Sequence, residues 1–295
     1  MPVSIRQIHP VFVGEVSGVD ISKPLSREDA AAIAKGMDEL AVLVFHDQTL
    51  TDEQQVAFSR NFGEIERSVA SNITKMEDRR LSTDMADVSN LDKNQKPLAR
   101  DSRARLFNLG NRLWHSDSSF RAIPAKFSLL SGRIVADKGG HTEFADMRAA
   151  YDALDDETRA QVEDLITEHS LLYSRGKLGF TDYTDEERVT FRPVRQRLVR
   201  TLPATGRKSL YLSSHIGTIV GWPVPEALDF IRELTEHATQ RQFVYSHKWR
   251  PNDLVIWDNR QTMHRVTRFD ESQVRDMRRT TIAGEGPTVE QVQAA

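Results

Sequence analysis

The sequence predicts a mainly β fold, a barrel or jelly roll covered by helices. From residue 113 onward the chain carries many short apolar runs of strand length, at 113–115, 127–130, 142–144, 198–201, 209–213, 243–245 and 254–257. Helical patterns are confined to the N-terminal part and to two insertions. Strands and helices therefore do not alternate as they would in a doubly wound α/β sheet.

The N-terminal part predicts a helix followed by a strand. Ser26 can cap a helix over 26–40, since acidic residues fill the first turn and Ile33 and Met37 fall at helical spacing. The run 41–45 is apolar throughout, which is typical of a strand buried on both faces.

A second helix and a long loop come next. Thr51 and Gln54 form a capping-box pattern, which opens a helix that ends near Gly63. Residues 67–105 are polar and weakly patterned. A loop of this length inside a compact domain is often a lid, so we expect this segment to cover an active site.

Helical patterns return in the insertion 147–197 and once more near the end of the chain. The first predicted helix begins at about Asp156, and its apolar face extends to His169. Residues 174–196 are basic and indicate a loop. Pro225 can start the last helix.

Length and composition restrict the class of protein. We expect the 295 residues to form a single domain, 1–295, with 40 Lys and Arg against 43 Asp and Glu. A net charge of −3 argues against a nucleic-acid partner. The absence of cysteine excludes disulfides, Fe–S clusters, thiolate zinc sites and cysteine nucleophiles, so a metal here must be held by His, Asp and Glu. No secretory signal or membrane span is visible, and a cytoplasmic location is expected.

A candidate metal site lies at His115-Ser116-Asp117. On an extended segment His115 and Asp117 project to the same face. His264 follows the apolar run 254–257 and could complete the facial triad of two histidines and one carboxylate found in non-heme iron oxygenases. Taken alone, Asp117 could instead be a turn residue, and His264 a surface histidine.

Arginines follow the last candidate ligand. Arg275 lies eleven residues after His264, and Arg278 and Arg279 come directly afterwards. Such a residue can form a bidentate pair with a ligand carboxylate, although arginine clusters are also common on solvated faces. Because neighbouring strand residues point oppositely, one of Arg278 and Arg279 should face away from a site.

Taken together, these motifs resemble the Fe(II)/2-oxoglutarate-dependent dioxygenases of the taurine dioxygenase and 2,4-D dioxygenase (TauD/TfdA) superfamily. The matching order extends over nearly the whole chain and comprises Trp114–Asp117, Gly139–Phe144, Trp257–Asn259 with His264, and Arg275 followed by Arg279. The resemblance is strongest to the 2,4-D (phenoxyacetate) branch, through residues 113–120, 146–154, 236–245 and 253–260.

The resemblance implies a double-stranded β-helix core, as in the cupins, and a set of site residues. These are the iron ligands His115, Asp117 and His264, the residues Thr142 and Arg275 on the distal carboxylate of 2-oxoglutarate, and Arg279 at the substrate carboxylate. His215 aligns with a histidine that helps to hold the aryl acid, although a strand-end histidine bonded to backbone is an equal interpretation.

The implied reaction uses Fe(II), 2-oxoglutarate and O₂, with ascorbate as a supporting reductant. Hydroxylation of the carbon next to the ether oxygen of a phenoxyacetic acid such as 2,4-D would give a phenol, glyoxylate, succinate and CO₂. The expected partner is thus a small aryloxyacetate, and the resemblance also suggests a homo-oligomer.

Alternatives stay open at this point. A sulfonate such as taurine is disfavoured because no histidine lies between His46 and His115, where the corresponding loop offers Asn72 and Lys75 instead. Other aromatic acids, including cinnamates and phenoxypropionates, are not separated from 2,4-D. The same ligands could hold zinc for hydrolysis, but a hydrolase would not need Arg275 and Thr142. A jelly-roll binding module without catalysis would not need the triad.

Overall fold

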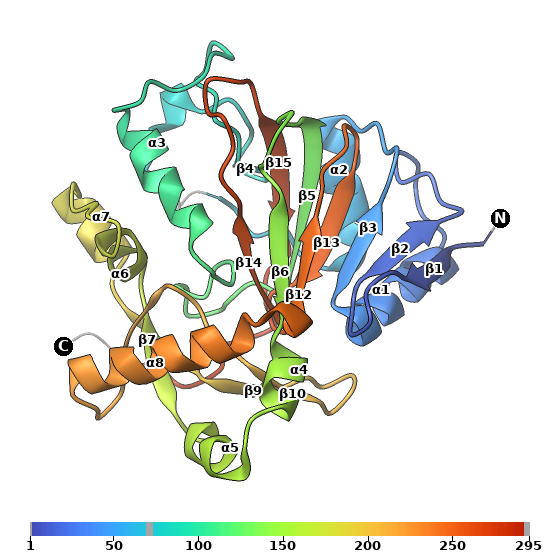
Figure 1. Ribbon diagram of the computed structural model, residues 1–295. Helices are drawn as coiled ribbons and strands as arrows, with labels where there is room; N and C mark the ends of the chain where they lie inside the picture. Colours follow the sequence, from blue (N-terminus) through green and yellow to red (C-terminus); the bar gives the residue numbers. More distant parts are fainter. Residues whose placement is uncertain (1, 69–72, 292–295) are drawn as a thin grey trace.

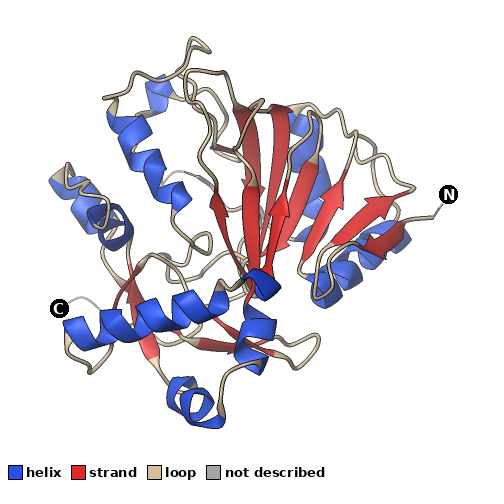
Figure 2. Ribbon diagram, viewed as in Figure 1, coloured by secondary structure: helices blue, strands red, loops and turns tan. Residues whose placement is uncertain are grey.

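Strands make the core of the protein, as the computed structural model of residues 2–68 and 73–291 shows (Figure 2). The mainly β core predicted from the sequence is therefore confirmed. The strands are β1 (Ser4–Gln7), β2 (Gly14–Ser17), β3 (Val42–Phe45), β4 (Ala86–Asp87), β5 (Phe127–Ile134), β6 (Thr142–Asp146), β7 (Ile166–His169), β8 (Val194–Arg197), β9 (Val199–Thr201), β10 (Lys208–Leu210), β11 (Ile216–Ile219), β12 (Val244–His247), β13 (Leu254–Asp258), β14 (Thr262–Val266) and β15 (Asp276–Thr281).

Two sheets position the site (Figure 1). The larger has the strand order β1-β2-β3-β13-β5-β15-β4, and the smaller has the order β12-β6-β14. Every pair in them is antiparallel except β2 with β3. Two further small sheets, β11-β7-β8 and β10-β9, lie outside this pair.

Successive side chains of β3 and β13 point to opposite faces of the larger sheet, so they contribute to two separate hydrophobic clusters. Leu43 and Ile256 face one side with the helix residue Met37, whereas Val44 and Val255 face the other side. That second cluster also contains a residue of the smaller sheet, Phe144 of β6. The larger sheet is thus covered by helices on one face and by the smaller sheet on the other.

Local capping explains where the first helices begin. The Ser26 hydroxyl accepts a hydrogen bond from the backbone of Asp29, and Thr51 forms the predicted reciprocal capping box with Gln54. The helices are α1 (Arg27–Leu40), α2 (Asp52–Ser59), α3 (Arg103–Asn108), α4 (Met147–Asp152), α5 (Asp156–Val162), α6 (Leu171–Gly176), α7 (Asp185–Thr190) and α8 (Val224–Ala238), with 3₁₀ turns at Arg60–Phe62, Met76–Asp78, Leu109–Arg112 and Arg241–Phe243. No described helix combines the length and apolar composition needed to cross a membrane.

Three local predictions are wrong. The helix from Asp156 ends at Val162, because the next residues form β7 and pair with both β8 and β11. The stretch 174–196, expected as a loop, holds the end of α6, all of α7 and most of β8. The strand expected at 113–115 is reduced to one isolated bridge at His115.

The long polar segment 67–105 contributes a strand to the larger sheet. Its strand β4 pairs with β15 at the edge of the larger sheet. Arg80 fixes the segment further, since its guanidinium binds Asp87 at 2.8 Å and Asp276 of β15 at 3.0 Å. These contacts bring the segment next to the strand that carries Arg278 and Arg279.

Candidate active site

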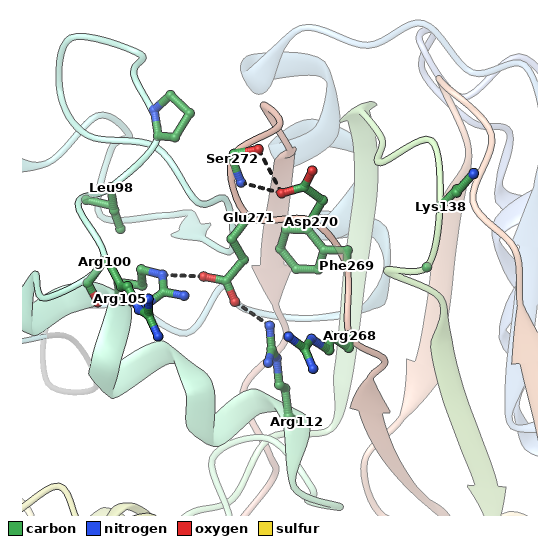
Figure 3. Close-up of a pocket in the computed structure, with 12 residues that line it drawn as sticks. Leu98, Arg100, Arg105, Arg112, Lys138, Arg268, Phe269, Asp270, Glu271 and Ser272 are labelled. Atoms are coloured by element: carbon green, nitrogen blue, oxygen red, sulfur yellow. Dashed lines mark hydrogen bonds and ion pairs between the residues drawn. The ribbon is translucent and has the colours of Figure 1, made fainter.

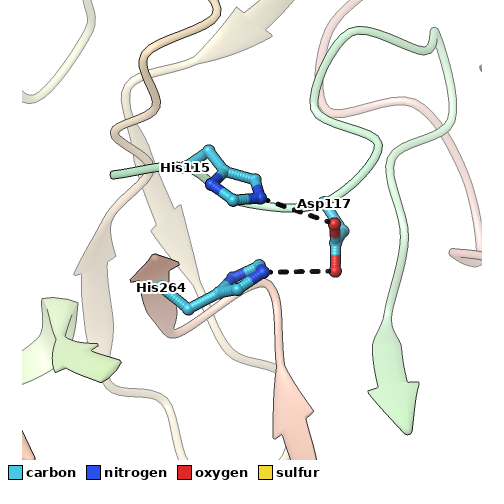
Figure 4. A group of neighbouring side chains, drawn as sticks. All are labelled: His115, Asp117 and His264. Carbon is cyan, nitrogen blue, oxygen red and sulfur yellow. Dashed lines mark ion pairs between the residues drawn. The ribbon is translucent and has the colours of Figure 1, made fainter. Parts of the chain in front are cut away.

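The structure brings His115, Asp117 and His264 together, although 149 residues separate the two histidines (Figure 4). The backbones of His115 and His264 form a two-way bridge, with N–O distances of 3.0 and 2.8 Å. Asp117 oxygens lie 3.9 Å from Nε2 of His115 and 3.6 Å from Nε2 of His264. One ligand atom from each residue lies within 4.8 Å of the others, a spacing that suits one metal ion.

Both imidazoles are held with Nε2 toward the carboxylate. Nδ1 of His115 lies 2.7 Å from the carbonyl oxygen of Leu113, so it carries the proton and leaves the Nε2 lone pair free. The ring of His264 packs against Trp257, with 4.6 Å between centroids. A histidine with one nitrogen bonded to a backbone carbonyl and the other free is the usual form of a metal ligand.

Asp117 has partners that the sequence did not predict. Ser128 of β5 donates a hydrogen bond to its Oδ2 at 2.7 Å, and Arg279 donates to its Oδ1. Asn259 accepts from the Asp117 backbone at 3.1 Å and donates to Ser128 at 3.0 Å. The Trp257–Asn259 motif was the available signal for Asn259, whereas Ser128 only falls within a predicted strand.

The charge of the cluster suits a divalent cation. Burial lowers the pKa of His115 and of His264, so both imidazoles are neutral. Burial alone would raise the pKa of Asp117, but the Arg279 guanidinium and the hydrogen bond from Ser128 hold it well below its usual range. Two neutral nitrogen donors and one carboxylate on one face fit an Fe(II) ion with open positions.

Arg275 is a buried cation without an acid. Its side chain is 4% exposed, stacks 5.1 Å from the Phe269 ring and donates to the carbonyl oxygens of Val88 at 3.2 Å and Gly140 at 3.5 Å. No carboxylate of the described residues pairs with it, and burial lowers its pKa to about 10. Burying an unpaired charge is costly, so this group fits an anionic ligand.

Thr142 is buried on β6, two residues beyond Gly140. Its hydroxyl oxygen accepts a hydrogen bond from Trp249 at 2.9 Å, which leaves the hydroxyl proton free to donate to a ligand oxygen.

Comparison with known proteins agrees with this geometry. The family model described as taurine catabolism dioxygenase TauD, TfdA family, matches residues 4–281. The chain belongs to this family. It is therefore an oxidoreductase of the 2-oxoglutarate-dependent dioxygenase class, as the sequence motifs predicted.

Relatives of the dioxygenase have named substrates. This chain is 43% identical to the alpha-ketoglutarate-dependent 2,4-dichlorophenoxyacetate dioxygenase of Cupriavidus pinatubonensis, over 95% of this chain and 98% of the relative. It is 40% identical to an (S)-phenoxypropionate dioxygenase of Sphingobium herbicidovorans, over 84% and 83%. A solved structure of AAD-2 in complex with Mn(II) and N-oxalylglycine is 64% identical, has a TM-score of 0.96, and covers 98% of this chain and 100% of its own.

The side chains of His115 and Asp117, part of the proposed metal-ligand cluster with His264, line a cavity of about 80 Å³. This cavity is called the metal cavity below, and the three side chains are called the metal cluster. The wall of the cavity includes His215, which the sequence predicted, and Arg175, which it did not. His215 is buried, and its Nδ1 shares a hydrogen bond of 2.8 Å with the Ser174 hydroxyl. Its ring packs edge-on against the ring of His115, with 5.9 Å between the centroids. The remaining lining includes both His115 and Asp117, Arg279, the apolar side chains Phe107, Phe120 and Leu171, and residues 68 and 86–88 of the polar segment.

A second cavity beside the first contains Arg275. The two share Val88, Asn108 and Asn111 in their walls, so the buried cation and the metal cluster are neighbours.

The two neighbouring arginines in the middle of β15, Arg278 and Arg279, point in different directions. Arg279 turns into the metal cavity, whereas Arg278 turns to the acids Asp52 and Asp276, each at 2.8 Å. Lys75 is exposed and lines a separate cavity of about 420 Å³, which shares residues 68, 87 and 108 with the metal cavity. Asn72 lies outside the described residues.

A further cavity, of about 880 Å³, is a basic basin on the outside of the dioxygenase (Figure 3). Glu271 joins Arg105 of α3 and Arg112 across it. The basin shares Arg105, Arg112 and Phe269 with the wall of the Arg275 cavity. Positive charge in this basin, beside the Arg275 cavity, favours the approach of an anion such as 2-oxoglutarate.

Proposed function

We propose that the protein is an Fe(II)- and 2-oxoglutarate-dependent dioxygenase that cleaves aryloxyacetic acids such as 2,4-D. The observation that carries the proposal is the buried His115–Asp117–His264 cluster beside a buried Arg275 without an acid. The substrate class is supported by the relatives named for 2,4-dichlorophenoxyacetate, at 43% and 41% identity.

In this proposal His115, Asp117 and His264 hold the iron, which supplies activation of O₂ together with 2-oxoglutarate. Arg275 and the Thr142 hydroxyl bind the distal carboxylate of 2-oxoglutarate through charge-assisted hydrogen bonds. The apolar wall of the cavity takes the aryl ring and excludes water.

These site residues hold the substrate so that the carbon next to its ether oxygen faces the metal cluster. Hydroxylation there gives an unstable hemiacetal, which collapses to a phenol and glyoxylate. One O₂ and one 2-oxoglutarate are consumed for each succinate, CO₂ and phenol formed.

The finer architecture is also proposed. The two facing sheets would form a double-stranded β-helix, or jelly roll, in one domain over 1–295. The segment 67–105 would act as the lid, because residues 68 and 86–88 line the metal cavity, and 147–197 would be an insertion outside the core. Contacts of Lys75 and Asn72 with the substrate, support by ascorbate, a homo-oligomer and a cytoplasmic location stay predictions.

Other functions have less support. The solved taurine dioxygenase of Burkholderia xenovorans is 27% identical, well below the 2,4-D relatives. Zinc hydrolysis or simple binding would leave the buried, unpaired Arg275 without a role.

An aerobic assay tests the function. Purified protein receives Fe(II), ascorbate and 2-oxoglutarate with 2,4-D, with taurine, or with no second substrate, and succinate and phenol are both measured. We expect phenol in step with succinate in the 2,4-D tube alone. Succinate rising with taurine and not with 2,4-D would overturn the substrate class, and no succinate in any tube would contradict the reaction.

Replacement of Arg279 by alanine is expected to raise the KM for 2,4-D far more than the KM for 2-oxoglutarate. Arg279 lines the metal cavity and its Nε is buried without a partner, so it can offer an N–H to the substrate carboxylate. Loss of such a charged contact costs on the order of 2–5 kcal/mol. Steady-state kinetics with each substrate varied in turn give both constants, and an unchanged KM for 2,4-D would remove Arg279 from the substrate site.

A further inference from the structure

Arg175 is a second buried arginine that lacks an acid. Three arginines of the described residues are fully buried: Arg148 at 1%, Arg275 at 4% and Arg175 at 5% exposed. Arg148 pairs with Asp146 at 2.8 Å, whereas no carboxylate of residues 2–68 or 73–291 forms an ion pair with Arg175 or Arg275. The proposed function explains Arg275 but leaves Arg175 unexplained.

The fold holds the Arg175 guanidinium in a fixed slot. It lies over the Phe107 ring at 4.6 Å on one side. Gly110 also lies against the guanidinium, since an added Cβ there would come within 2.4 Å of the guanidinium carbon. The hydrogen-bond partners are neutral oxygens, those of Ser174 at 3.1 Å and Asn111 at 3.3 Å.

One N–H group of the Arg175 guanidinium has no hydrogen-bond acceptor in this slot. Nε of Arg175 is buried and has no hydrogen-bond partner. A buried cation with only neutral partners has lost its hydration without gaining a counter-charge, which is unfavourable unless an anion binds beside it. Arginine is the residue whose fork of N–H groups best matches a carboxylate.

The position of Arg175 restricts which anion this can be. Arg175 lines the same cavity as His115, Asp117 and Arg279, not the cavity that contains Arg275. The Ser174 hydroxyl forms hydrogen bonds with both Arg175 and His215, and the His215 ring packs against the ring of His115. Phe107 and Phe120 give the cavity aromatic walls. A carboxylate attached to an aryl group matches this combination.

We propose that Arg175 binds the carboxylate of the aryl acid, together with Arg279, and so selects acids over neutral aryl ethers. The inference rests on the proposed function and adds a substrate-binding residue to it. Two buried arginines without acids then match the two anionic ligands of the reaction, 2-oxoglutarate at Arg275 and the aryl acid at Arg175.

Calorimetric titration tests this role without turnover. Protein loaded with Mn(II) and the inert analogue N-oxalylglycine is titrated with 2,4-D and, separately, with the neutral amide of 2,4-D. The chains are wild type, Arg175→Gln, Arg175→Lys and Arg200→Gln. Arg200 is the matched control, because it also stacks on an aromatic ring, Tyr211 at 4.8 Å, but lines a cavity away from the metal cluster.

We expect Arg175→Gln to weaken binding of 2,4-D by about 30-fold or more, the range for losing a buried charge contact. Binding of the amide and of N-oxalylglycine should change little. Arg175→Lys keeps the charge without the fork, so it should weaken 2,4-D binding less, and Arg200→Gln should not weaken it. If Arg175→Gln does not fold, the comparison of acid with amide in Arg175→Lys decides the matter in the same way.

Equal losses for the acid and the amide would show that Arg175 only supports packing, and unchanged binding of 2,4-D would exclude it from the site. Either result contradicts the role of Arg175 alone. Failure of the wild type to bind 2,4-D contradicts the proposed function, and this role with it.

Discussion

Replacement of His115 by alanine is expected to abolish 2-oxoglutarate turnover while the protein stays folded. In the proposed site His115 supplies one of three ligands on an open face, and Asp117 and His264 alone could not fix a metal in the same geometry. Loss of an outer hydrogen-bond partner of a ligand already costs about 10- to 100-fold in metal affinity, and loss of the ligand itself should cost more.

Two measurements check this result. Succinate formation reports turnover, and calorimetry with Mn(II) alone reports metal binding. His9→Ala is the control, because His9 is half-buried, two residues after β1, and does not line the metal cavity. A folded His115→Ala protein that binds Mn(II) like wild type, or still forms succinate, would contradict the assignment of the ligands.

The second large effect is expected at Arg275. Replacement of Arg275 by glutamine removes the buried cation that we propose for the distal carboxylate of 2-oxoglutarate. The KM for 2-oxoglutarate should rise by about 30-fold or more, since a buried charged contact is worth on the order of 2–5 kcal/mol. The affinity for Mn(II) should stay close to that of wild type, because Arg275 does not contact the metal cluster.

Thermal unfolding gives an independent readout for Arg275. A ligand that binds only the folded state raises the melting temperature, so N-oxalylglycine with Mn(II) should stabilise wild type but not Arg275→Gln. Arg200→Gln is the control, because Arg200 lines a cavity that shares no residue with the Arg275 cavity or with the cavity at His115 and Asp117. Equal stabilisation of wild type and Arg275→Gln would place the 2-oxoglutarate carboxylate elsewhere.

Local sequence signals predicted the N-terminal elements well. The caps at Ser26 and Thr51 act within three residues, so they can be recognised without the rest of the fold. The segment after Val162 could not be predicted in this way. Its apolar spacing also fits a helix, and the choice of strand depends on pairing with β8 and β11, which are distant in sequence.

The site was predicted in part for a similar reason. Alternation placed His115 and Asp117 on one face, but the chain turns directly after them, with Ser118 in the left-handed region at φ 55°. The contact with His264 comes from a bridge that only the tertiary fold makes. Arg175 was missed because it lies in a basic stretch that indicated a loop, and its slot is built by Phe107 and Gly110, far away in sequence.

A crystal structure of this chain with Mn(II), N-oxalylglycine and 2,4-D tests the central claim most directly. We expect one metal ion bound by His115, Asp117 and His264, with the distal carboxylate of N-oxalylglycine on Arg275 and the aryl acid in the cavity beside the metal. A metal bound by other residues, or N-oxalylglycine bound away from Arg275, would contradict the proposed site and the chemistry derived from it.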